Sequence, residues 1–144
     1  MSEPVLFDTT AHIQAFRTRS LLPSMFDLEG EFMVHLSSVV AEELYIGAST
    51  TDMRRSVNRL WFFAQEMDRL ITPNADHWRE AGLVLQQVAA RYGSARVAAG
   101  RMTNDALIAL SARDSKLVIL TTNIKDFGLL REFLPFAFRP FNLS

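Results

Sequence analysis

Short runs of consecutive apolar residues alternate along this chain with longer segments in which apolar residues recur at helical spacing. The clearest runs are PVLFD at residues 4–8, EFMVHLS at 31–37 and KLVILTT at 116–122. Strands that are apolar on both faces are typical of parallel sheets covered by helices on each side. The pattern therefore predicts an α/β fold with a short parallel sheet, to which a last strand near 136–142 is assigned.

The segments between these runs are predicted to be helical from their 3.6-residue periodicity and capping residues. The predicted helices cover residues 11–22, 38–47 (capped by Ser37 or Ser38), 53–71, 73–92 (capped by Thr72), 104–114 (capped by Thr103) and 126–133. Within them, Trp61 and Trp78 are expected on buried faces, and Phe62 is expected to remain outside the core. The stretch 93–102 is predicted to be a flexible loop.

Length and composition limit the possible classes of protein. A chain of 144 residues with 49% apolar residues is expected to form a single domain, residues 1–144. The chain has no cysteine, which excludes disulfides, thiolate metal sites and cysteine nucleophiles. The apolar runs are too short to span a membrane, and the first residues do not resemble a secretion signal, so a cytoplasmic protein is expected.

Charge is unevenly distributed. Residues 1–50 contain two arginines against seven acids, whereas residues 51–101 contain eight arginines against five acids. A basic middle segment is compatible with nucleic acid, but a solvated helix face is the favoured explanation. Composition alone therefore does not identify a nucleic-acid-binding protein.

Four polar residues occupy positions that an α/β fold brings to one edge of the sheet. Asp8 and Asn123 each follow an apolar strand, and sites in parallel sheets form beyond the carboxyl ends of the strands. Asp105 falls in the first turn of the helix before one of these strands, and Glu43 lies in the helix after another. We therefore expect Asp8, Glu43, Asp105 and Asn123 to converge.

Clustered carboxylates repel one another unless a cation holds them together. Oxygen ligands without histidine or cysteine suit Mg²⁺ or Mn²⁺ better than Zn²⁺. A hydrated metal of this kind activates water for hydrolysis of a phosphodiester. Taken singly, each acid also has a structural explanation: Asp8 and Asp126 as helix caps, Glu43 as a surface residue and Asp105 as a partner of a helix dipole.

Four segments in this order and spacing resemble the PIN domain, and most of all the VapC-type toxins of toxin–antitoxin pairs. They are VLFDTT, SSVVAEELYIGA, TNDALIALSARD and LVILTTNIKDF. The resemblance extends from residue 5 to about residue 141. It implies a PIN-like three-layer α/β/α fold and a Mg²⁺- or Mn²⁺-dependent endoribonuclease, a hydrolase that acts as the toxin of such a pair.

The resemblance also assigns the site residues. Asp8 corresponds to the family's first acid, Glu43 to the Glu of a Glu-Leu-x-x-Gly pattern completed by Leu44 and Gly47, and Asp105 to the third acid. These three acids are the expected metal ligands, and Asn123 stands at the fourth position, which is acidic in the strict form of the pattern. Asn cannot balance a second metal ion well, and Asp126 is a possible substitute for it.

The resemblance further implies a VapB-like antitoxin as partner, a homodimer and RNA as the substrate. Arg54, Arg55 and Arg59 are candidate contacts for the RNA backbone, and Phe62 is predicted to lie at an interface with the antitoxin or a second subunit. His12, His35 and His77 share no ligand spacing and are expected to be structural.

Two other functions stay open. A PIN-fold protein-interaction module with weak or no nuclease activity is favoured by the Asn at position 123. A phosphatase with an aspartyl nucleophile is less well supported, because Thr10 stands where such enzymes usually carry a second Asp.

Overall fold

The computed structural model describes residues 2–18, 31–98 and 100–141, which form an α/β structure around a five-stranded parallel sheet. The strands are β1 (Glu3–Phe7), β2 (Phe32–Ser37), β3 (Leu70–Ile71), β4 (Val118–Thr121) and β5 (Phe138–Pro140). Their order in the sheet is β3-β2-β1-β4-β5. The predicted α/β class and parallel sheet are thus confirmed.

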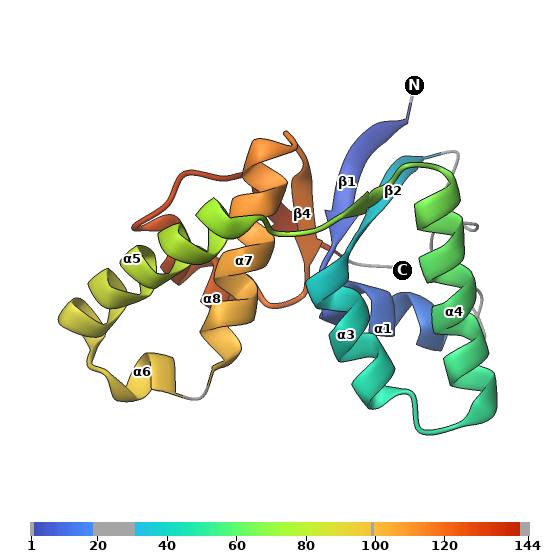
Figure 1. Ribbon diagram of the computed structural model, residues 1–144, viewed down its shortest axis with the longest axis horizontal. Coiled ribbons are helices and arrows are strands. Elements are labelled where there is room, and N and C mark those ends of the chain that lie inside the picture. Colours follow the sequence, from blue (N-terminus) through green and yellow to red (C-terminus); the bar gives the residue numbers. More distant parts are fainter. Residues whose placement is uncertain (1, 19–30, 99, 142–144) are drawn as a thin grey trace.

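Helices cover both faces of this sheet, which gives the predicted three-layer α/β/α arrangement. The described helices are α1 (Thr9–Thr18), α3 (Ser38–Gly47), α4 (Thr51–Glu66), α5 (Ala75–Tyr92), α6 (Ala95–Ala98), α7 (Arg101–Asp114) and α8 (Ile124–Arg131). In Figure 1, α1, α3 and α4 lie on one side of the strands, and α5, α7 and α8 lie on the other. The helix predicted for residues 11–22 starts two residues earlier, and its last four residues lie outside the described part of the chain.

The pairing of the central strands β1 and β4 determines where the residues after them lie. Leu6 is paired with Ile119, and Phe7 is paired with Leu120, so both strands end side by side. The chain leaves β1 through α1 toward one face and leaves β4 through α8 toward the other. This is a topological switch point, the place where open parallel sheets leave a crevice beyond their strand ends.

The core explains why the strands are apolar on both sides. Phe7 is fully buried between its neighbours, with its ring centroid 4.6 Å from that of Phe141 and 5.3 Å from that of His12. Burial lowers the pKa of His12 to about 3, so this ring stays neutral and packs as an aromatic residue. A structural role for His12 agrees with the sequence expectation.

One predicted helix boundary is wrong by several residues. The helix expected over residues 53–71 ends at Glu66, and Leu70 and Ile71 form strand β3 beside β2. The chain turns at Asp68, whose φ of 57° is left-handed, and the amide of Arg69 then donates to the carbonyl of Ala64 at 2.7 Å. Apolar residues recur at helical spacing through this turn, so the sequence pattern does not reveal it.

Two helix caps also differ from the predictions. Helix α5 is capped by Asn74, not Thr72, because the Asn74 side chain accepts a hydrogen bond from the amide of His77 at 2.9 Å. Helix α7 begins after Gly100, not Thr103, since Gly100 has a left-handed φ of 76° that glycine adopts without strain. The short helix α6 occupies part of the predicted loop 93–102.

Helix α5 is rotated relative to the prediction, which placed Trp78 on its buried face. Its buried stripe contains His77, Ala81, Val84 and Val88, whereas Trp78 is 58% exposed. On α4, Trp61 is partly buried against the core, and Phe62 is 60% exposed, as expected. No helix in the described part of the chain is long and apolar enough to cross a membrane.

His77 joins α5 to α7, so its removal is expected to destabilise the fold. Its Nδ1 accepts from the amide of Asn74 at 3.0 Å, and its Nε2 lies 2.6 Å from Oδ2 of Asp114. We predict that His77→Ala lowers the free energy of unfolding by about 2 kcal/mol, from the lost capping box and a buried polar contact. Urea denaturation measures this, with the exposed Arg79→Ala as control. Equal stability of both variants would contradict this role.

Candidate active site

Asp8 lies at the switch point between β1 and β4, directly after the last residue of β1. Its Oδ1 accepts from the hydroxyl of Thr10 at 2.8 Å and from the amide of Ala11 at 2.9 Å. Its Oδ2 accepts a short hydrogen bond from the hydroxyl of Thr121 on β4. Only 4% of Asp8 is exposed, so the protein itself holds this carboxylate in a fixed orientation.

Burial makes the charge on Asp8 costly. Desolvation raises the pKa of Asp8 above its ordinary value of 3.8, and the nearby anion of Glu43 adds to this rise. The hydrogen bonds from Thr121, Ala11 and Thr10 act in the opposite direction without cancelling it. A buried acid whose pKa is raised in this way is typical of functional sites.

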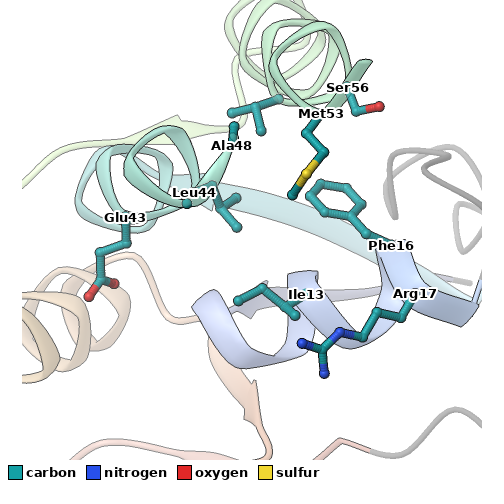
Figure 2. Close-up of a pocket in the computed structure, with 10 residues that line it drawn as sticks. Ile13, Phe16, Arg17, Glu43, Leu44, Ala48, Met53 and Ser56 are labelled. Atoms are coloured by element: carbon teal, nitrogen blue, oxygen red, sulfur yellow. The ribbon is translucent and has the colours of Figure 1, made fainter. Parts of the chain in front are cut away.

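Glu43 is held by one donor on each carboxylate oxygen. Thr9 donates its hydroxyl to Oε1 at 2.5 Å, and Asn104 on α7 donates its amide to Oε2 at 3.3 Å. Thr9 is the residue after Asp8, so Glu43 is tied to the end of β1 and to the start of α7. Figure 2 shows the carboxylate of Glu43 directed away from the apolar side chains around Leu44.

Asn123 occupies the N-cap position of α8, directly after the end of β4, without a capping hydrogen bond from its side chain. Its backbone amide donates to Oγ1 of Thr121 at 2.8 Å, and its side-chain Nδ2 donates to Oδ2 of Asp126 at 3.0 Å. The bond to Asp126 uses the nitrogen of the amide and leaves Oδ1 as its acceptor. Asp126 does not cap α8, since it lies within the first turn, and it also pairs with Arg96 at 3.8 Å.

Asp105 lies on α7 immediately after Asn104 and is half-buried, with its Oδ2 shielded from solvent. The structure thus brings Asp8 close to Glu43, and Glu43 to the helix that carries Asp105. Across residues 2–18, 31–98 and 100–141, no three His, Asp or Glu side chains are close enough to form a ready-made metal site. The convergence of all four predicted residues therefore stays a prediction.

The side chains at the switch point nevertheless fit a hard divalent cation. Mg²⁺ is commonly held by one or two carboxylates while it keeps several waters. Asp8 and Glu43 supply two anionic groups, and one cation between them would relieve the desolvation and repulsion that raise the pKa of Asp8. The hydroxyls of Thr9 and Thr121 fix the orientation of these ligands, as outer-shell groups do in metal sites.

An apolar groove adjoins Glu43 on the side of α1. It has a volume of about 250 Å³ and is bounded by α1, α3 and α4. Phe16, Leu44 and Met53 form its apolar walls, with Arg17 at its rim (Figure 2), and Val57 also lines it. The groove thus leads from the helices on this face toward Glu43.

Sequence reasoning overlooked the hydrogen-bond donors that orient the carboxylates. Thr121 and Asn104 are ordinary residues in the sequence, and each acquires its role only when distant segments meet, whereas Thr10 contacts Asp8 from two residues away. The repeated threonine at residues 121–122, at the end of an apolar strand, is the one available signal. A buried hydroxyl there needs a partner, and Asp8 provides it.

The comparisons with known proteins agree with this architecture. The sequence profile of the PIN domain matches residues 5–130. A DNA-bound VapBC structure from Salmonella typhimurium has 18% identity, covers 97% of this chain and 98% of that chain, and gives a TM-score of 0.63. The corresponding structure from Rickettsia felis, VapBC2 with a promoter DNA fragment, has 19% identity, coverage of 96% and 99%, and a TM-score of 0.63.

A third solved structure is VapBC-5 from Mycobacterium tuberculosis, described as a member of the VapBC family of toxin-antitoxin systems. It has 22% identity, coverage of 97% and 98%, and a TM-score of 0.53. No curated protein matched the sequence. Identities this low establish a shared fold, and the profile match extends over most of the chain. The protein therefore belongs to the PIN domain family.

Proposed function

We propose that this protein is a Mg²⁺- or Mn²⁺-dependent endoribonuclease that acts as the VapC-type toxin of a toxin–antitoxin pair in the cytoplasm. The proposal treats residues 1–144 as one PIN-like domain. The observation that carries it is the buried carboxylate of Asp8, fixed by three protein donors at the switch point beside a second anion, Glu43. An arrangement that costs stability in the absence of a ligand is expected where a cation binds.

In this proposal Asp8, Glu43 and Asp105 hold the divalent cation. When bound, the cation supplies a polarised water and charge neutralisation for phosphodiester hydrolysis. The chain's own contribution is orientation: Thr121 and Thr10 fix Asp8, Thr9 and Asn104 fix Glu43, and Asp126 turns the amide of Asn123 so that Oδ1 faces away from that bond. Asn123 then orients a water or the substrate.

Three arginines on α4 are candidate contacts for the RNA backbone. Arg54, Arg55 and Arg59 are exposed, and Arg55 forms a solvent-exposed pair with Asp52 at 3.8 Å. An exposed pair of this kind is weak and is readily exchanged for a phosphate. These contacts are proposed on charge alone.

A VapB-like antitoxin and a second copy of the chain are the proposed protein partners. The apolar groove beside Glu43 is suited to an antitoxin segment, since it leads to the candidate active site and has a basic residue, Arg17, at its rim. The exposed Phe62 on α4 is the proposed contact at such an interface, because an exposed phenyl ring gains most from burial against a partner.

Cleavage of a structured RNA tests the proposal. We expect fragments in the presence of Mn²⁺ and no fragments in EDTA, because the carboxylates need a cation to act on a phosphodiester. If the protein neither cleaves RNA nor binds millimolar Mn²⁺ in calorimetry, the rival assignment of a PIN-fold interaction module takes its place. The neutral Asn123 is the feature that favours this rival.

Removing the hydroxyl that orients Glu43 tests whether the position of this carboxylate matters for cleavage. Thr9→Val keeps the shape of the side chain but removes the donor to Oε1 of Glu43. We predict that RNA cleavage in Mn²⁺ falls roughly 10- to 100-fold, as is usual when an outer-shell partner of a metal ligand is lost. The exposed Thr122→Val is the matched control. A Thr9→Val enzyme as active as this control would remove Thr9 from the proposed site.

A further inference from the structure

Resting on the proposed ribonuclease function, we infer that the cavity between α3, α5 and α7 is a subsite for one unstacked base of single-stranded RNA, with Trp78 as its stacking platform. The cavity has a volume of about 320 Å³, at the lower end of the roughly 300–1,000 Å³ typical of small-ligand sites. It is lined by other residues of α3 than the apolar groove described above and shares no lining residue with that groove.

The cavity offers a base both an aromatic surface and an apolar floor. Trp78 is 58% exposed although it lies on a helix that buries its opposite face, so an indole ring remains open to a ligand. Pro73 and the buried Leu107 contribute apolar surface to the same cavity. Aromatic rings of this kind bind unstacked bases of single-stranded nucleic acids irrespective of base identity.

Asn104 connects this cavity to the candidate active site. It lines the cavity, and its Nδ2 donates to Oε2 of Glu43 at 3.3 Å. A base seated on Trp78 would therefore be bordered by the residue that orients Glu43. An RNA strand that places one base in the cavity presents its neighbouring phosphodiester to the carboxylates.

The charge of the cavity favours a base over a phosphate. Glu42 is the single charged side chain among the described residues that line it, and an anion repels phosphate. A carboxylate accepts hydrogen bonds from the amino groups of guanine, adenine and cytosine, and Ser38 adds a hydroxyl. Glu42 and Glu43 thus face two sides of α3, one toward a base and the other toward the reaction centre.

Tryptophan fluorescence tests base stacking without any need for catalysis. Trp78 and Trp61 are the two tryptophans of the chain, and Trp61 is partly buried against the core. In EDTA, an eight-nucleotide single-stranded RNA is expected to quench the emission of Trp61→Phe, which retains Trp78, and to leave Trp78→Phe unquenched. An RNA of the same length with abasic sites in place of its bases is expected to quench the emission of neither variant. Quenching absent from Trp61→Phe, or equal with the abasic strand, would overturn the subsite.

Kinetics distinguish this subsite from the proposed function itself. Trp78→Ala is expected to raise KM for single-stranded RNA roughly 5- to 150-fold, the range that stacking of one base on an aromatic ring contributes, with a smaller effect on kcat. Trp78→Phe is expected to stay close to wild type, and Glu42→Gln to weaken the preference for amino-bearing bases over uracil. Unchanged KM in an active Trp78→Ala enzyme rejects the subsite and leaves the nuclease assignment intact.

A second copy of the chain is the competing occupant of this surface. Sedimentation of wild type and Trp78→Ala decides between them, since the subsite predicts the same oligomeric state for both. A dimer that dissociates in Trp78→Ala, with no change in KM for single-stranded RNA, would show that Trp78 serves an interface instead.

Discussion

Asp8→Asn is expected to abolish Mn²⁺-dependent RNA cleavage, with a loss greater than the roughly 10- to 100-fold typical of an outer-shell substitution. The amide retains the size of the carboxyl and keeps an oxygen for Thr10 and Ala11. The hydroxyl of Thr121 can turn to accept from the new nitrogen, so the fold is retained while the anionic ligand is lost. Equal cleavage by Asp8→Asn and wild type would remove Asp8 from the reaction.

The same variant is expected to be more stable than wild type at neutral pH. Burial raises the pKa of Asp8 above 3.8, so the folded state binds this proton more tightly than the unfolded state. The contribution of Asp8 to the stability of wild type therefore falls as pH rises through the interval between 3.8 and the folded-state pKa. Asn has no charge to bury. Asp8→Asn is therefore expected to be more stable than wild type above that interval, and to lose this difference below pH 3.8.

Thermal unfolding with and without Mn²⁺ measures both the loss of the metal ligand and the gain in stability expected for Asp8→Asn. A cation that binds only the folded state raises Tm, and wild type is expected to show this rise whereas Asp8→Asn is not. Tyr92→Phe is a suitable control for the Tm values, because its hydroxyl contacts Glu132 on the surface, away from the candidate site. A lower Tm for Asp8→Asn at pH 7 would contradict the assignment of Asp8 as a destabilising anion.

Phe7→Ala is expected to produce the largest loss of stability, about 3–5 kcal/mol. Phe7 is completely buried at the end of β1, and its ring contacts those of His12, Phe32 and Phe141. Truncation leaves a cavity under the backbone that positions Asp8. Urea denaturation measures the loss, and Leu83→Ala, at a side chain that is 52% exposed, is the control. A loss below about 1 kcal/mol would show that this end of the sheet tolerates repacking.

The sheet and its helices could be predicted because their signals are local. Three apolar runs correspond to β1, β2 and β4, and Ser37 caps α3 as its hydroxyl predicts. The position of Asp8 beyond β1 followed from the same pattern, since only the strand end had to be located. The PIN resemblance, confirmed by the match over residues 5–130, supplied the pairing of distant segments.

Strand β3 and the orientation of α5 could not be predicted, because they depend on tertiary contacts that leave no local pattern in the sequence. Strand β3 has two residues and forms only because β2 offers an edge to Leu70 and Ile71. The rotation of α5 is set by the contact of His77 with Asp114, and it moves Trp78 from the expected core to the surface. Neither periodicity nor capping residues show which of the two is buried, because Trp78 and His77 are neighbours in the same helical turn.

Anomalous diffraction from a crystal soaked in Mn²⁺ tests most directly whether the buried acid at the switch point is a metal ligand. A peak bonded to oxygens of Asp8 and Glu43, with Asp105 completing or approaching the shell, is the result that the proposed function predicts. A saturating soak that leaves these carboxylates without an ion, or places the ion at other residues, would contradict it.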